Sequence, residues 1–158
     1  MGTVVIPGIY YPAAIRFDRS GNLYLVGNGE NLIRKYTAGT WVASVVAGSG
    51  TSGYEDGAAT AAEFSNPWGL AIDAGGNLYV AGNGTWNGGT DSPDQAIRYI
   101  DAVTREVSTF AGSGTAGYAD AIGAAAAFSA PTGVAIDKNG TVYVLDKNNN
   151  RIRKIISL

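Results

Sequence analysis

Residues 66–80 read NPWGLAIDAGGNLYV, and the same pattern recurs on both sides of this stretch. The other copies are YPAAIRFDRSGNLYL at 11–25 and APTGVAIDKNGTVYV at 130–144. In each copy an apolar run ends on Asp, a Gly-containing turn follows, and a second apolar run contains a Tyr, which is the pattern of a β-hairpin. Repetition at this scale predicts a chain built from similar structural units.

Each copy continues into further apolar runs, so that one unit contains four predicted strands. The third run carries Arg34, Arg98 or Arg153 next to an Ile, and the fourth run leads into Ala-Gly-Ser-Gly at 47–50 and 111–114. The runs are rich in Val, Ile, Leu and Tyr and are apolar on both alternations, which is typical of strands covered on both faces. We therefore expect an all-β chain of four-stranded antiparallel units.

The composition of the 158 residues agrees with this and excludes several functions. The 23 Gly residues suit many tight turns, and a net charge of −2 gives no basic excess for holding nucleic acid. The absence of Cys and His removes disulfides, the usual zinc sites, a thiol nucleophile and an imidazole base. No apolar run approaches the roughly 18 residues of a membrane span. We expect no metal, no cofactor and no membrane, and the first residues indicate no compartment.

Two segments between the units are rich in Ala, and one unit carries an insertion. Asp56–Phe64 and Asp120–Phe128 each begin with an Asp that can cap a helix and end on a Phe that can anchor it, which predicts one or two helical turns. From Asp73 to Arg98 there are 25 residues, against 16 from Asp18 to Arg34, so the second unit has nine more. These lie in 82–95, which we expect to form an extended loop.

These units resemble the NHL repeat. The resemblance rests on the Pro-x-Gly-x-Ala-x-Asp-x-x-Gly-Asn-x-Tyr-Val core, the Asn-x-Ile-Arg-Lys third run, and Ala-Gly-Ser-Gly followed by Gly-Tyr-x-Asp. The first copy departs from it with Ala14 for Gly and Gly27-Asn28 at the end of the second run, and the second copy has Gly82 where the third has Asp146. The resemblance implies a β-propeller with three blades in this chain.

The resemblance also sets the expected organisation of residues 1–158 as a half-propeller. We expect an N-terminal strand at 3–8 and blades at about 11–48, 66–112 and 130–158. Because propellers close with about 4 to 8 blades, three would leave two apolar faces open. In closed propellers of this family an N-terminal strand completes the last blade, so we expect a six-bladed homodimer with exchanged strands. The alternative is that the chain is a fragment of a larger protein.

The long connections 49–66 and 113–130 and the insertion are expected on one face of the propeller, where binding sites concentrate. Trp68 and Thr132 are expected near the mouth of the axial channel. Tyr54 and Tyr118 recur in register and either pack the loops onto the blades or contact a ligand. The candidate binding residues are Trp68, Trp86, Tyr54, Tyr118, Asp91, Asp94 and Thr132.

Two recurring sets of charged residues are expected to be structural. Asp73 and Asp137 are expected to accept hydrogen bonds from their own turns. The recurring arginines are expected at strand edges rather than in an anion site.

We expect a noncatalytic scaffold or an interaction module for a protein, peptide or glycan, with no catalytic residues. The alternative is an enzyme, because six-bladed relatives include lyases and lactonases, but the metal sites that this implies use His or channel acids. RNA binding, known for some NHL propellers, is disfavoured by the charge. A designed or reconstructed repeat protein with no evolved ligand is a further alternative.

Overall fold

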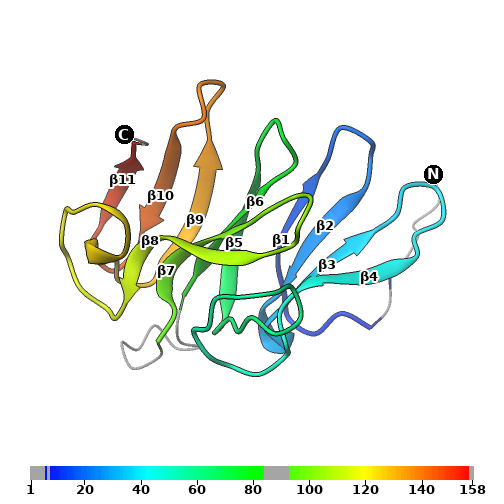
Figure 1. The fold of residues 1–158 in the computed structure, drawn as a ribbon, viewed down its shortest axis with the longest axis horizontal. Coiled ribbons are helices and arrows are strands. Elements are labelled where there is room, and N and C mark those ends of the chain that lie inside the picture. Colours follow the sequence, from blue (N-terminus) through cyan, green and yellow to red (C-terminus); the bar gives the residue numbers. More distant parts are fainter. Residues whose placement is uncertain (1–5, 7, 84–92, 157–158) are drawn as a thin grey trace.

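A computed structural model describes residue 6, residues 8–83 and residues 93–156. Figure 1 shows three twisted antiparallel sheets arranged side by side like the ribs of a fan. Within each sheet, strands that follow one another in the chain are also neighbours. The strands are β1 (Pro12–Phe17), β2 (Leu23–Gly27), β3 (Leu32–Tyr36), β4 (Ala43–Ala47), β5 (Pro67–Ile72), β6 (Leu78–Gly82), β7 (Gln95–Ile100), β8 (Val107–Gly114), β9 (Pro131–Ile136), β10 (Val142–Asp146) and β11 (Arg151–Ile155).

The predicted all-β architecture is confirmed. Blade 1 (β1–β4) and blade 2 (β5–β8) are four-stranded, whereas blade 3 (β9–β11) has three strands within the described residues. The N-terminal strand expected at 3–8 falls largely outside the described residues. Neither of the two short 3₁₀ helices found in the described part has the length or apolar character needed to cross a membrane.

The predicted helical turns between blades are corrected by the structure. Only the second segment contains a helix, the three-residue η2 (Gly123–Ala125), and its N-cap Ile122 makes no capping hydrogen bond through its side chain. The other 3₁₀ helix, η1 (Asn28–Glu30), lies elsewhere, between β2 and β3. The Asp residues at the start of the two segments do not cap, because buried arginines bind them instead. The anchoring role of Phe64 and Phe128 is confirmed, since both rings are buried.

The turn between the first two strands of each blade is organised by an Asp, as predicted. The Oδ1 atom of Asp73 accepts hydrogen bonds from the backbone N–H of Gly75 at 2.8 Å and of Asn77 at 2.9 Å. Asp137 makes the equivalent pair, and the N–H of Thr141 holds the pKa of this carboxyl below its ordinary value. These bonds are local, so each hairpin specifies its own turn.

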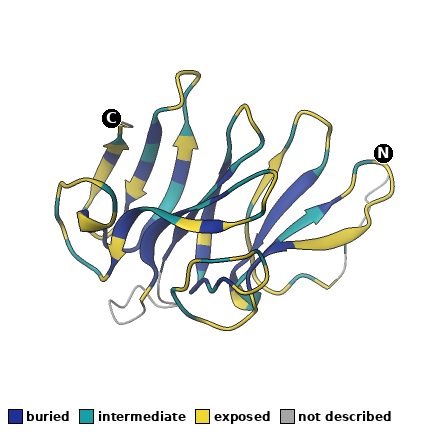
Figure 2. Cartoon of the chain, viewed as in Figure 1, coloured by how far each residue is buried: buried dark blue, intermediate teal, exposed yellow. Residues whose placement is uncertain are grey.

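The core lies between the blades rather than within one of them. Val26 and Ile33 of blade 1 pack in one cluster with Leu70 and Val80 of blade 2, over Phe64. A second cluster joins blade 2 to blade 3 through the corresponding positions, namely Ala81, Ile97, Val134, Val144 and Phe128. Figure 2 shows buried positions concentrated in inner strands such as β2, β6 and β7, whereas β4 and β11 are mostly exposed. Each fully buried Val, Leu, Ile or Phe side chain contributes about 1.5–3 kcal/mol to the stability of the fold.

Blades 1 and 3 each have one outer face whose residues match those of a buried interface between blades, but no neighbouring blade in the described chain covers that face. In blade 3, Leu145 and Ile152 hold the positions of Val26 and Ile33 but are 51% and 71% exposed. In blade 1, Ile15 holds the position of the buried Leu70 and is 51% exposed. The face of blade 3 that points away from blade 2, its leading face, is therefore open. The face of blade 1 that points away from blade 2, its trailing face, is open at Ile15, whereas Leu23 and Leu25 on it are buried.

Candidate functional site

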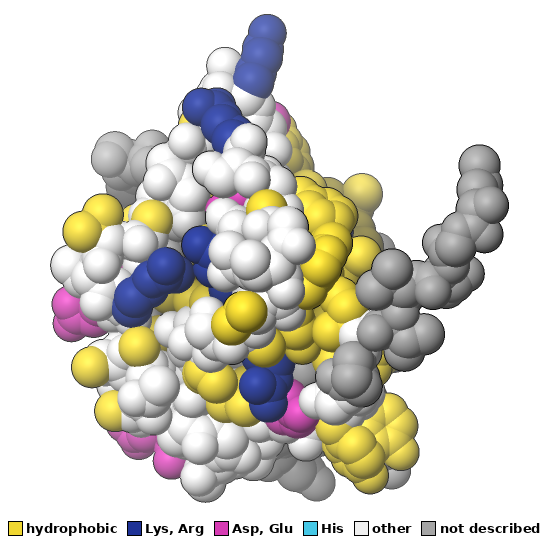
Figure 3. Space-filling model, turned by 90° about the vertical axis from the view of Figure 1, so that its right-hand side faces the viewer, with side chains coloured by type: hydrophobic (Ala, Val, Ile, Leu, Met, Phe, Trp, Pro, Cys, Tyr) yellow, Lys and Arg dark blue, Asp and Glu magenta, His cyan; other side chains and the backbone are white. Residues whose placement is uncertain are grey.

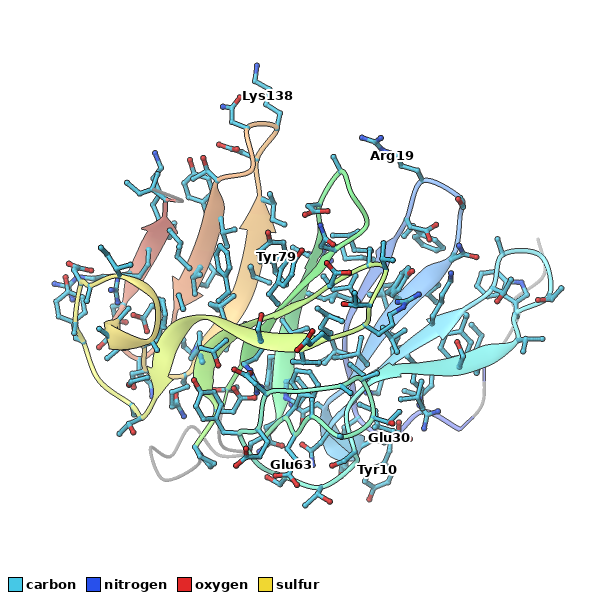
Figure 4. The ribbon with its side chains drawn as sticks, viewed as in Figure 1. Tyr10, Arg19, Glu30, Glu63, Tyr79 and Lys138 are labelled. Carbon is cyan, nitrogen blue, oxygen red and sulfur yellow. The ribbon has the colours of Figure 1, made fainter. Side chains whose placement is uncertain are left out.

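The molecule has two ends that differ in their loops. Figure 4 shows Arg19 and Lys138 at the tips of short hairpin turns at one end, and Glu30, Glu63 and Tyr10 at the opposite end, where the long connections lie. We call the latter end the long-loop face. The sequence placed the candidate binding residues there.

Arg98 fastens the first long connection to blade 2. This side chain is fully buried on β7, and its Nη2 atom donates to Asp56 Oδ1 at 2.6 Å and to the carbonyl of Glu55 at 2.8 Å. Its Nη1 atom donates to the carbonyl of Glu63 at 2.9 Å. The Tyr54 ring lies 4.8 Å from the guanidinium. One cation thus holds the residues on both sides of the Ala-rich stretch of this connection against the blade.

Arg153 repeats this arrangement in blade 3. It donates to Asp120 Oδ1 at 2.6 Å and to the carbonyls of Ala119 and Ala127 at 2.8 and 3.1 Å. The Tyr118 ring lies 5.0 Å from it. The structural role predicted for these arginines is confirmed. The predicted edge position is corrected for Arg34 and Arg98, since β3 lies between β2 and β4 and β7 lies between β6 and β8.

In blades 2 and 3 a second carboxylate reaches the arginine, from a different sequence position in each blade. In blade 3, Asp146 contacts Arg153 Nη1 at 2.9 Å and accepts the N–H of Ser129 at 2.8 Å. Blade 2 has Gly82 at that position, and Asp94 supplies the carboxylate instead, 3.6 Å from Arg98 Nη1 and 3.2 Å from the N–H of Ser65.

Gly82 and Gly27 make room for these replacements. A Cβ atom on Gly82 would collide with the Asp94 carboxylate, and one on Gly27 would lie 2.9 Å from Glu30 Oε2. In blade 1 that carboxylate binds Arg34 Nε at 2.8 Å. All three blades therefore retain an acid for the arginine of the third strand.

Asp94 is an interior residue rather than an exposed loop residue. Its side chain is fully buried, and its Oδ1 atom has no hydrogen-bond partner among the described residues. Burial raises the pKa of Asp94 to about 7, although the nearby Arg98 charge opposes this. The expectation that Asp94 faces a ligand on an open loop is corrected by this placement.

The two tyrosines pack the long connections and differ in exposure. Tyr54 donates its hydroxyl to the carbonyl of Gly112 at 3.1 Å and accepts from Thr109 at 3.0 Å. Tyr118 keeps about half of its surface exposed and contacts Asp120 at 3.2 Å. Tyr118 therefore retains an accessible ring on the long-loop face.

Trp68 and Thr132 line a groove. The groove, of about 730 Å³, runs along the first strands of the three blades and also includes Leu145 and Ile152. Trp68 is 38% exposed. Trp86 and Asp91 lie outside the described residues.

A second groove, of about 740 Å³, lies among the short turns at the opposite end. Its acids Asp18, Asp73 and Asp137 are engaged by their own turns. No cluster of three or more candidate metal ligands forms within residues 6, 8–83 and 93–156.

The sequence analysis missed the role of Asp56 and Asp120 as partners of the arginines. A signal was present, because Gly-Tyr-x-Asp and Ile-Arg both recur in register. Local capping propensity pointed instead to a helix start.

The comparisons with known proteins support a propeller. The family model of the NHL repeat matches residues 128–155, which confirms the resemblance at the third blade. The chain is 36% identical over 103 residues to Protein SUPPRESSOR OF QUENCHING 1, chloroplastic, of Arabidopsis thaliana, covering 65% of this chain and 9% of that protein.

Two solved structures show the same fold. One is a protein of unknown function from Bacteroides thetaiotaomicron, with a TM-score of 0.73, 25% identity and coverage of 85% of this chain and 32% of that chain. Another is an auxiliary nutrient binding protein from Bacteroides ovatus, with a TM-score of 0.68, 26% identity and coverage of 90% and 36%. The chain has a propeller-type fold with three blades and spans about a third of these structures.

Proposed function

We propose that the chain is a noncatalytic propeller module that closes a six-bladed ring with a second copy and presents its long-loop face to a protein, peptide or glycan. The observation that carries this is the exposure of Leu145 and Ile152. At both interfaces inside the chain, the corresponding side chains are fully buried. Exposed apolar side chains at positions built for burial favour a partner surface.

The interface between blades 1 and 2 indicates which kind of surface would cover Leu145 and Ile152. Val26 and Ile33 are covered by Leu70 and Val80 of the following blade. The corresponding residues of blade 1 are Ile15 and Leu25, on its trailing face. Blade 3 of one copy would therefore meet blade 1 of another, and two such joints give six blades, within the range of closed propellers.

The outer edge of β11 adds a second element to the joint. In blades 1 and 2 the third strand pairs with a fourth, β4 or β8. Residues 3–8, TVVIPG, resemble the fourth-strand sequence SVVAG at 44–48. We assign this segment of the second copy to the open edge of β11, where its backbone N–H and C=O groups would pair with those of β11.

The use of the charged residues supports a noncatalytic role. Three acids of the long connections and the insertion, Asp56, Asp94 and Asp120, form ion pairs with buried arginines and hold these segments in place. Trp68 and Tyr118 combine exposed aromatic surface with a polar group, which suits recognition of a partner.

Light scattering of the full chain tests the assembly. We expect about twice 16.2 kDa for the wild type. The double variant Leu145→Ser/Ile152→Ser should give a folded monomer, because it removes the apolar joint. Val103→Ser is the matched control, since Val103 is exposed in a turn remote from both open faces. A monomeric wild type, or a double variant that remains dimeric, would contradict the proposal.

A further inference from the structure

Each joint between two blades inside the chain is crossed by a hydrogen bond at the same place. In the first joint, Asn31 Oδ1 of blade 1 accepts the backbone N–H of Asn66 at 3.0 Å. In the second joint, Gln95 Oε1 of blade 2 accepts the backbone N–H of Ala130 at 2.6 Å. Asn66 and Ala130 both immediately precede the Pro that begins the first strand of the next blade. Two different side chains therefore make the same bond, which is a repeated feature of the joint.

Asn150 holds the acceptor position of this bond in blade 3. It lies two residues before the Ile of the third strand, as Asn31 and Gln95 do. Its backbone has the left-handed conformation of Asn31, with a φ of 52° against 54°. The Asn150 side chain is exposed and has no hydrogen-bond partner within residues 6, 8–83 and 93–156. An exposed acceptor thus lies where the other two blades use one to hold the next blade.

Tyr11 holds the donor position in blade 1. It immediately precedes the Pro that begins β1. Its φ of 48° matches the 47° of Asn66 and the 49° of Ala130, so the three residues share a left-handed backbone ahead of the first strand. The two halves of a third joint are therefore present in the chain, one on blade 3 and the other on blade 1.

A second polar contact repeats beside the first. Asn28 Nδ2 donates to the carbonyl of Pro67 in the next blade at 3.1 Å. Lys147 holds the position of Asn28 in blade 3, since each directly follows the strand residue that pairs with the first Pro of its blade. Lys147 is exposed, and its ammonium is also a donor. The leading face of blade 3 thus carries both an acceptor and a donor where the first joint uses an acceptor and a donor.

These polar contacts are directional, whereas the apolar contacts of the joint are not. Figure 3 views the molecule from the blade 1 side and shows hydrophobic side chains gathered on part of it. Because the hydrophobic effect is non-directional, an apolar surface by itself accepts a docked blade in several registers. A hydrogen bond requires its donor and acceptor to lie about 3 Å apart and nearly in line, so it selects one register.

We propose that Asn150 of one copy accepts the backbone N–H of Tyr11 of a second copy and thereby fixes the register in which blade 3 docks on blade 1. This inference rests on the proposed function and names the residue pair that makes its joint specific. In blade 3 the N–H equivalent to that of Tyr11 belongs to Ala130, which is already bonded to Gln95. Asn150 therefore finds this donor on blade 1 of another copy and not on another blade 3.

Asn150→Gly tests the bond, because Gly keeps the left-handed backbone and removes the acceptor. Sedimentation equilibrium should show the dimer dissociation constant rising about thirtyfold, since the ring has two such joints and each loses one hydrogen bond of ordinary net strength. Asn139→Gly is the matched control. Asn139 is exposed in a short hairpin turn at the opposite end, where blade 2 already has Gly75, so this change should leave the constant unaltered.

Amide hydrogen exchange detects the bond itself. At a concentration where both proteins are dimeric, the Tyr11 amide should exchange faster in Asn150→Gly than in the wild type. Asn31→Gly calibrates the measurement, because it should speed exchange of the Asn66 amide within one chain. An Asn150→Gly dimer with an unchanged dissociation constant, or with unchanged exchange at Tyr11, would overturn this bond and leave the proposed function standing. A wild type that stays monomeric would overturn the proposed function and the bond together.

Discussion

Arg98 and Asp56 are 42 residues apart in sequence, yet the guanidinium and the carboxylate are 2.6 Å apart. The arginine is fully buried in the third strand of blade 2, and the acid belongs to the connection that leaves blade 1. One ion pair therefore links a blade to the loop that precedes it. The same link between Arg153 and Asp120 attaches the next connection to blade 3.

Arg98→Leu should reduce the unfolding free energy by about 3–5 kcal/mol, the range for removing one partner of a buried ion pair. The change leaves Asp94 buried without its cation and removes the bonds that hold Glu55, Asp56 and Glu63 of the first connection. Arg34→Leu is the matched control at the same position of blade 1, where Arg34 binds Glu30 and no preceding connection; a loss of about 1 kcal/mol or less is expected there. Urea unfolding measures both, and equal losses would contradict the role of Arg98.

The stability of the chain should fall as pH rises from about 4 to about 7, through the titration of Asp94. Burial raises the pKa of this acid to about 7 from an ordinary value near 3.8, so the folded state holds a proton that the unfolded state has lost. Deprotonation within this range then costs folding free energy. The stability that the protonated Asp94 contributes is fully present below the pKa of Asp94 in the unfolded state and is lost above its pKa in the folded state.

Asp94→Asn carries no titrating proton, so it should flatten this part of the pH profile. Unfolding free energies at about pH 5 and about pH 8 measure the slope in both proteins. The wild type should lose more stability than the variant between the two conditions. An identical slope would show that Asp94 does not titrate in this range.

The sequence predicted the hairpins because their information is local. Asp73 specifies its turn through hydrogen bonds to residues two and four positions ahead, so the pattern is readable within one stretch. The register of the repeat also identified Phe64 and Phe128 as anchors, because both recur before the same Pro.

The environment of Asp94 could not be read in the same way. Asp94 lies in an insertion without a counterpart in the other blades. In blade 2 it occupies the place beside the arginine that Asp146 occupies in blade 3, although the two acids do not align in sequence. The capping prediction for Asp56 failed for a related reason. Burying a guanidinium without a carboxylate costs more free energy than leaving a short helix uncapped. This cost arises only once the blades are assembled, so the local sequence does not indicate it.

Trp86→Ala should leave folding nearly intact, with a loss below about 1 kcal/mol, the ordinary range for a surface substitution. Trp86 belongs to the insertion that the other two blades lack, so the repeat architecture does not require it. Thermal unfolding checks this. A loss above about 3 kcal/mol, in the range of large core truncations, would identify the indole as core and the insertion as a packing element.

Deletion of residues 1–8 should lower stability by several kcal/mol, because the strand assigned to the edge of β11 is removed from each joint. Melting of the truncated chain at high concentration, beside the full chain, gives the comparison. An unchanged melting temperature would show that these residues do not clasp the ring.

Disulfide trapping tests most directly which faces meet, because the chain has no Cys of its own. Ile15→Cys in one sample and Leu145→Cys in another introduce single thiols at the positions of Leu70 and Val26, which share one cluster inside the chain. After mixing and mild oxidation, the ring predicts a linked product of about twice 16.2 kDa that contains one chain of each kind. A yield no higher than that from Val103→Cys mixed with Leu145→Cys would contradict the docking of blade 3 on blade 1.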